Sequence, residues 1–237
     1  MNNILDSLSG LSSSVYFGLF LSLLAYFLGI QLKKKFKISI LNPLLVSIVL
    51  VIVFLVIFNI DYEDYNKGGR YISYFLTPAT VCLAIPLYQQ LHLLKDNFKA
   101  VMMGILSGVL ASLVSIFVFS LLFRFSRELY ITMLPKSITT AIGMAVSEEL
   151  GGITTITVAV IVLTGIIGNV AGEKICKIFK INNPIAVGLA FGTSSHAIGT
   201  SKALELGEVQ GAMSSLSIAV SGLITVVLAP VFANLIV

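Results

Sequence analysis

The amino-acid sequence predicts an all-α protein that crosses a membrane several times, with seven or eight hydrophobic helical segments, including discontinuous or re-entrant helices. Only 11% of the 237 residues are charged, whereas soluble domains carry about 25%. The mean hydropathy is +1.01, and 57% of the residues are hydrophobic. The few charges are also clustered, which leaves long uncharged stretches that we expect to be membrane helices.

Seven uncharged stretches each reach the roughly 20 residues that a helix needs to cross the hydrocarbon core. They run over residues 7–32, 38–60, 71–94, 100–123, 150–172, 181–201 and 209–237. An eighth segment, residues 137–147, is too short to cross alone. The apolar runs are continuous rather than alternating, which excludes a transmembrane β-barrel. We therefore expect residues 1–237 to form a single integral membrane domain.

Two lysine-rich loops, at residues 33–37 and 174–180, are predicted to be cytoplasmic because basic loops stay on that side. Five helical segments lie between them, and five full crossings would place the loops on opposite sides. Either one segment enters the membrane and returns, or the second basic loop is an exception to the charge rule. Residues 135–149 are the natural re-entrant candidate, since this segment is short and ends in two carboxylates.

Two self-similarities indicate an internal repeat of the kind found in secondary transporters. KKKFKISILNP (33–43) resembles KICKIFKINNP (174–184), and TPATVCLAIPLYQQL (77–91) resembles PKSITTAIGMAVSEEL (135–150). The two offsets differ, so a tandem repeat does not explain both. Whether the repeat is inverted stays open, because an inverted repeat would prefer the two Asn-Pro loops on opposite faces.

Prolines mark helix starts in the second pair of segments. Thr77 and Pro78 have the pattern of a helix N-cap and first turn, Pro86 is predicted to interrupt that same helix, and residues 135–137 also resemble a helix start. Helix N-termini near Lys136 and Ser137 would suit a small carboxylate. The alternative is that these prolines only start or kink helices and that Lys136 extends to the membrane surface.

Glu148 and Glu149 precede the flexible pair Gly151–Gly152. One carboxylate could carry a coupling proton, because burial raises a carboxyl pKa. The alternative is a solvated turn between two helices.

The segment GTSSHAIGTSK, residues 192–202, is the most polar part of an apolar stretch. Such a sequence can unwind and offer amides, hydroxyls, an imidazole and an ammonium group to an anionic or hydroxylated solute. Close helix packing is the alternative. A Ser/His nucleophile lacks both an orienting acid and a nucleophile motif, so we expect no enzyme activity. The predicted substrate-binding residues are Thr77, Pro78, Lys136, Ser137, Thr193, Ser194, Ser195, His196, Thr200, Ser201 and Lys202, and the hinge or pathway residues are Pro86, Gly143, Gly151, Gly152, Asn169, Gly192 and Gly199.

Small residues recur at helical spacing in residues 104–112 and 168–172, which predicts tight helix contacts within or between subunits. Asn169 fits an interhelical hydrogen bond as well as a pathway position. Cys82 and Cys176 stand apart with no metal-ligand spacing, so neither a metal nor another cofactor is expected. No basic patch interleaved with aromatic residues indicates nucleic-acid binding.

The motifs PKS, SEELGG and GTSSHAIGTSKA, with the apolar run between them, resemble the LrgB/CidB family across nearly the whole chain. That family was named for antiholin-like regulators of murein hydrolase export and autolysis. A related protein is the plastidial glycolate/glycerate transporter, which resembles an LrgA-type half joined to an LrgB-type half, and some bacterial members are associated with pyruvate. The resemblance implies a multi-pass protein of a bacterial plasma membrane, in contact with lipid and with a separate LrgA/CidA-like subunit.

The residues and the resemblance together lead to one expected function and one alternative. We expect a carrier or facilitator of a small organic acid, a monocarboxylate such as pyruvate, glycolate or glycerate, that influences autolysis and forms a homo-oligomer, with a dimer favoured. The alternative is an antiholin-like interaction subunit that regulates holin-like pores and murein hydrolase export.

Overall fold

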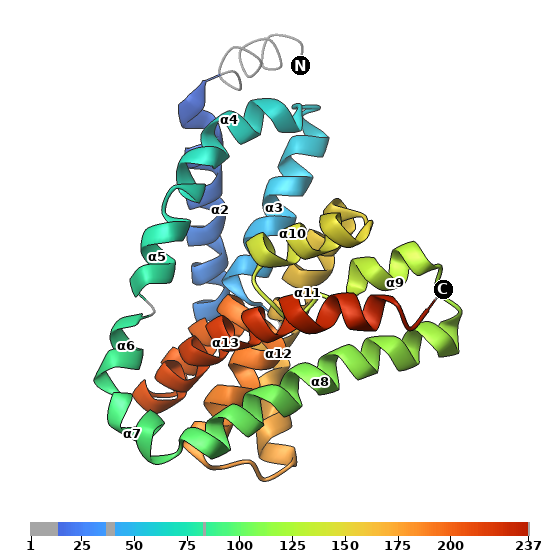
Figure 1. The fold of residues 1–237 in the computed structure, drawn as a ribbon. Coiled ribbons are helices and arrows are strands. Elements are labelled where there is room, and N and C mark those ends of the chain that lie inside the picture. The colour runs from blue at the N-terminus through green and yellow to red at the C-terminus, as the bar shows by residue number, and fades with distance from the viewer. Residues whose placement is uncertain (1–13, 37–40, 83, 237) are drawn as a thin grey trace. The chain divides into compact units, whose positions relative to one another are not determined.

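Every secondary-structure element in the described part of the chain is a helix, as predicted. The computed structural model describes residues 14–36, 41–82 and 84–236, except for the side chains of Leu76, Thr77, Thr80, Pro86 and Leu87. The helices are shown in Figure 1. The chain divides into two compact units, Met1–Cys82 and Leu83–Val237, and each is described separately.

The first unit is built on the long helix α2. It contains α2 (Val15–Phe36), α3 (Pro43–Ile57), α4 (Tyr62–Ser73) and α5 (Leu76–Cys82). Both α3 and α4 pack against α2. Gly18 of α2 lies against the Tyr65 backbone of α4, where any side chain would collide. The Ser22 and Tyr65 hydroxyls, 2.8 Å apart, add a polar contact between the same two helices.

The second unit is organised around its last helix, α13. Its elements are α6 (Ala84–Gln89), α7 (Leu91–Asp96), α8 (Phe98–Phe123), α9 (Arg127–Met133), α10 (Thr140–Leu150), α11 (Thr154–Ile178), α12 (Pro184–Leu206) and α13 (Glu208–Ala233). Helices α6, α8, α10 and α12 pack against α13, and α11 packs against α10 and α12. The short helices α9 and α10 lie between α8 and α11 in the sequence, and both contact α11.

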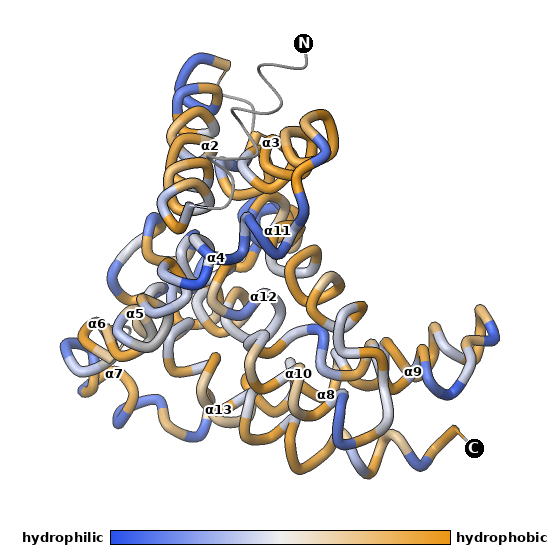
Figure 2. Tube along the Cα trace, turned by 90° about the horizontal axis from the view of Figure 1, so that it is seen from above, coloured by the Kyte–Doolittle hydropathy of each residue, from blue (hydrophilic) through white to orange (hydrophobic). Residues whose placement is uncertain are grey.

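One face of α8 supplies much of the core of the second unit. Val101, Ile105, Val109 and Leu113 recur every fourth residue and are buried, whereas Phe119 and other large apolar side chains are exposed. Figure 2 shows the hydrophobic colouring running along the long helices and the hydrophilic colouring gathering at turns and helix ends. Exposed apolar faces of this kind are suited to lipid rather than water.

Four helices in the described residues are long and apolar enough to cross a membrane, namely α2, α8, α11 and α13, so the predicted count of seven or eight segments is not confirmed. Helix α3 has only 15 residues. The helix expected over residues 71–94 is broken into short pieces, with Pro78 and Pro86 in the first turns of α5 and α6. Proline has no N–H to donate and its ring clashes with the preceding turn, so both prolines favour a helix start over a helix interior.

Two of the predicted helix starts are displaced. Residues 135–137 form turns, and α10 begins only at Thr140, because the Pro135 carbonyl accepts a short-range bond from the Ile138 amide instead of starting a helix. Thr77 lies inside α5, which begins at Leu76; its side chain and that of Pro86 are outside the description.

The two Asn-Pro segments have the same local structure. Asn42 and Asn183 each cap a helix that has proline at its first position, and their side-chain oxygens accept from the amides of Leu44 and Ile185. This shared capping explains the similarity of the two loops.

Candidate functional site

Helix α12 is broken in its middle, at the histidine of the GTSSHAIGTSK segment. His196 has φ 41° and ψ −138°, while the residues on both sides are helical. A Cβ added to Gly199 would lie 2.8 Å from the Phe191 carbonyl oxygen. In a continuous helix, two residues eight positions apart, as these are, would be separated by about 12 Å along the axis, so their close approach requires a sharp bend between them. The predicted loss of helix in this segment is therefore confirmed at one residue.

Hydroxyl groups just before the break weaken the helix. The Thr193 and Ser194 hydroxyls donate to the carbonyls of Leu189 and Ala190, four residues earlier, at 2.8 and 2.7 Å. Such bonds compete with the backbone ladder and bend helices. A non-glycine residue at positive φ costs about 1–3 kcal/mol, so surrounding contacts must hold His196 in place.

The His196 side chain is held by α11. It is 3% exposed, and its Nε2 lies 2.9 Å from the Ile161 carbonyl oxygen. A carbonyl only accepts, so Nε2 carries the hydrogen and donates it. The ring rests on Gly165, where a Cβ would lie 2.8 Å from Nε2, and the neighbouring Ser195 rests in the same way on Gly168. Glycines on α11 therefore create the space that the break occupies.

The second half of α12 is joined to α13 by hydroxyls. The Thr200 hydroxyl donates to the His196 carbonyl at 2.9 Å and lies 2.7 Å from the Ser214 hydroxyl of α13. Three more hydroxyl residues follow Ser214 on α13 at helical spacing, and all are buried: Ser217, Ser221 and Thr225. One face of α13 is thus hydroxylated from the break in α12 toward α10.

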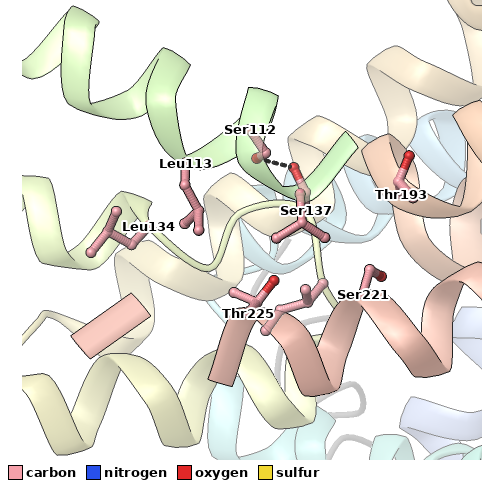
Figure 3. A pocket seen from close by; sticks show the side chains of 9 residues that line it. Ser112, Leu113, Leu134, Ser137, Thr193, Ser221 and Thr225 are labelled. Atoms are coloured by element: carbon pink, nitrogen blue, oxygen red, sulfur yellow. Dashed lines mark hydrogen bonds between the residues drawn. The ribbon is translucent and has the colours of Figure 1, made fainter. Parts of the chain in front are cut away.

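These hydroxyls lead to a small cavity, called here the hydroxyl pocket. Its five hydroxyl residues come from α8, the turn before α10, α12 and α13, and Figure 3 shows how they surround it: Ser112, Ser137, Thr193, Ser221 and Thr225. Apolar side chains, among them Leu113 and Leu134, complete the lining. The volume is about 10 Å³, which is the space of a single water molecule.

Lys136 is connected to the hydroxyl pocket through Ser137. Its Nζ donates to the Ser137 hydroxyl at 3.0 Å, and that hydroxyl lies 2.9 Å from the Ser112 hydroxyl. Ser137 is 4% exposed. The structure therefore brings together three of the predicted binding residues, Lys136, Ser137 and Thr193.

The two predicted coupling carboxylates lie at the end of α10. Glu148 and Glu149 are exposed, while the adjacent Ser147 is fully buried. Gly151 ends the helix with φ 85°, a conformation that favours glycine. The turn after it is fixed by the Gly152 amide, which donates to the Ser147 carbonyl at 2.7 Å.

Buried hydroxyls tie the turn after α10 to its neighbours. The Thr132 hydroxyl of α9 accepts from the Ile153 amide at 2.8 Å. The Thr157 hydroxyl of α11 lies 2.9 Å from the Thr132 carbonyl and 2.7 Å from the Ser147 hydroxyl. Helices α9, α10 and α11 are therefore joined at one buried polar point.

Lys202 lies in an ion-pair group and does not line the hydroxyl pocket. Its Nζ is 3.2 Å from Glu173 of α11 and 3.3 Å from Glu205, and Glu173 also pairs with Lys177. Asn169, one turn before Glu173, donates to the Ile198 carbonyl at 2.8 Å and to the Ser201 hydroxyl at 3.2 Å. These contacts fasten the second half of α12 to α11.

The other predicted residues are spread over both units. Pro78 is exposed in the first unit, and Ser194 and Ser201 are exposed on α12. Gly143 packs against Ile161, and Gly192 against the Ser214 backbone. Among the described residues, no group of three or more His, Cys, Asp or Glu side chains gathers as metal ligands.

The sequence reasoning missed three residues of the hydroxyl pocket: Ser112, Ser221 and Thr225. Ser112 was assigned only to helix packing. The signal for the other two is the spacing of hydroxyl residues at 214, 217, 221 and 225, which places them on one face of an otherwise apolar helix.

Comparison with known proteins gives the family. Residues 22–235 match the LrgB-like family. The chain belongs to this family. It is 40% identical over 218 residues to the antiholin-like protein LrgB of Bacillus cereus and to that of Bacillus anthracis, which covers 92% of this chain and 95% of each relative. No solved structure matches. With its apolar helices, this LrgB-like chain is a membrane protein.

Proposed function

We propose that this LrgB-like protein is a secondary carrier or facilitator of small monocarboxylates of the pyruvate, glycolate or glycerate class. The observation that carries the proposal is the break of α12 at buried His196, in a unit whose other long helices are apolar enough to span a membrane. Transporters place such broken helices at their binding sites, because irregular backbone at membrane depth persists only around a cavity or within protein.

The polar groups near the break suit a monocarboxylate. Lys136 supplies a positive charge, and Ser137 and Thr193 supply hydroxyls close to it. The buried Thr200 and His196 would recognise a hydroxyl or keto oxygen when the helices move apart. Glu148 or Glu149 would carry the coupling proton; both are exposed at the end of α10, so burial does not assist this role.

We also propose that the protein forms a homodimer and acts with a separate LrgA/CidA-like subunit in a bacterial plasma membrane. Transport of a metabolic acid would influence autolysis through the energy state and the pH of the wall. The predicted small-residue contacts are used within the second unit: Gly108 faces Thr193, and Gly172 faces Phe191. Contacts between subunits would therefore use other, exposed apolar faces.

The second candidate function is an antiholin-like subunit that regulates holin-like pores and murein hydrolase export. The name of the Bacillus relatives favours it. This function needs assembly with a pore-forming partner but does not need the residues around His196.

Uptake of labelled pyruvate and glycolate into proteoliposomes tests the carrier, with and without an LrgA-like subunit. We expect Lys136→Ala to lower uptake about tenfold or more, since a hydrogen bond to a charged group contributes about 1.5–3 kcal/mol, and His196→Ala to lower it roughly fivefold, since a bond between neutral groups contributes about 1 kcal/mol. The matched controls are Lys95→Ala and His92→Ala, two exposed residues of α7 that should leave uptake unchanged. Uptake no greater than in empty vesicles, with or without the partner, would exclude the carrier.

A further inference from the structure

Thr225 is a buried residue whose side chain lines the hydroxyl pocket. The residue is 4% exposed and lines the hydroxyl pocket, and its hydroxyl makes no hydrogen bond within the described part of the chain. Figure 3 shows this hydroxyl turned from α13 toward the cavity. The other serines and threonines of the pocket bond to a carbonyl or to another hydroxyl. A hydroxyl that faces a cavity and has no protein partner is free to bind a polar occupant of that cavity.

The charge near the hydroxyl pocket favours an anionic oxygen as its occupant. Ser137 connects the pocket to the Lys136 ammonium group. No carboxylate is among the residues that line the cavity. A cation would meet the lysine charge without a counter-charge. A carboxylate oxygen could accept hydrogen bonds from the Thr225 hydroxyl and from Ser112 or Ser137, near a positive group.

The size of the pocket limits how much of a solute it can hold. A volume of about 10 Å³ admits one oxygen atom, not a whole three-carbon acid. The remainder of a solute would extend from this point toward the neighbouring helices after they separate. The pocket is therefore suited to anchor one end of the solute while the rest of the site is closed.

We propose that the hydroxyl pocket binds one carboxylate oxygen of the transported monocarboxylate, and that Thr225 and Ser221 of α13 and Ser112 of α8 are affinity-determining residues. This inference rests on the proposed carrier function. It assigns substrate recognition to α13 and α8, in addition to the polar segments around Lys136 and His196.

Thr225→Val tests the proposal, because valine has nearly the same shape but no hydroxyl. In detergent without solute, we expect the variant to unfold at the same temperature as the wild type or higher, since the lost hydroxyl has no protein partner. In proteoliposomes, the KM for glycolate should rise about tenfold, the effect of losing one hydrogen bond to a charged group. The stabilisation of the wild type by added glycolate should be lost, and the uncharged amide of glycolate should stabilise neither protein.

Ser215→Ala is the matched control. Ser215 is also buried on α13, but its hydroxyl donates to the Gly211 carbonyl and does not line the pocket. This variant should keep the wild-type KM.

The outcomes separate the pocket from the carrier function. If the wild type takes up glycolate and Thr225→Val does so with the same KM, the pocket proposal is wrong and the carrier proposal stands. A lower unfolding temperature in Thr225→Val than in Ser215→Ala, without solute, would show a structural role and also overturn it. If glycolate stabilises the wild type but not Thr225→Val and no uptake occurs, the binding pocket stands and the carrier does not. If glycolate is neither bound nor taken up, both proposals fall.

Discussion

Thr157→Val should destabilise the second unit more than the small change in side-chain volume suggests. Thr157 is fully buried, and its hydroxyl joins α11 to the Thr132 carbonyl of α9 and to the Ser147 hydroxyl of α10. A hydroxyl has one hydrogen, so the geometry corresponds to one donated and one accepted bond. Valine keeps the shape and removes both bonds. At about 1 kcal/mol for each, the loss is about 2 kcal/mol.

The assay uses the two cysteines of the chain. Cys176 is buried in the second unit and Cys82 is exposed, so in a Cys82→Ser background a thiol-reactive dye reports when the second unit opens. A loss of about 2 kcal/mol corresponds to a midpoint about 4–8 °C lower for a chain of this length. Thr155→Val, at an exposed position of the same helix, is the control. If the two variants unfold at the same temperature, the hydrogen bonds of Thr157 do not hold the three helices together.

Two further perturbations address the contacts within each unit. Glu173→Gln removes partly exposed ion pairs with Lys177 and Lys202, so we expect a loss of stability of at most about 1 kcal/mol. The unfolding midpoint should fall below that of the wild type, and this difference should shrink in 1 M salt. A difference that does not depend on salt would contradict this assignment. In the first unit, Ser22→Ala and Tyr65→Phe remove the same 2.8 Å hydrogen bond, so a double-mutant cycle followed by circular dichroism should give a coupling of about 1 kcal/mol, and additive effects would argue against the contact.

Local signals in the sequence predicted local structure well. The Asn-Pro pairs at residues 42–43 and 183–184 were expected only as two similar loops; in the structure they begin helices, because an Asn side chain and a proline ring each favour a helix start. The dense run of small and hydroxyl residues before His196 correctly predicted that α12 would not be continuous. Hydropathy alone failed over residues 71–94, where the prolines divide an apolar stretch into short helices.

Contacts between distant segments were harder to predict. The hydroxyl pocket combines Ser112, Ser137, Thr193 and two residues of α13, and no local pattern indicates which helix faces meet. Lys202 was expected to bind solute, but it lies near Glu173, 29 residues earlier in the chain and on another helix. Such pairings depend on how the helices pack, which spacing along one segment does not define.

The glycines of α11 have a consequence for motion. Side chains of α12 rest directly on bare backbone at Gly165 and Gly168, so few rotamers become fixed when the two helices meet. At these two glycines no α11 side chain would be freed if the helices separated, but the hydrogen bonds of His196 and Asn169 and the Lys202–Glu173 ion pair would be broken. Motion of α12 against α11 would therefore be opposed by these polar contacts and not by interlocked side chains at Gly165 and Gly168.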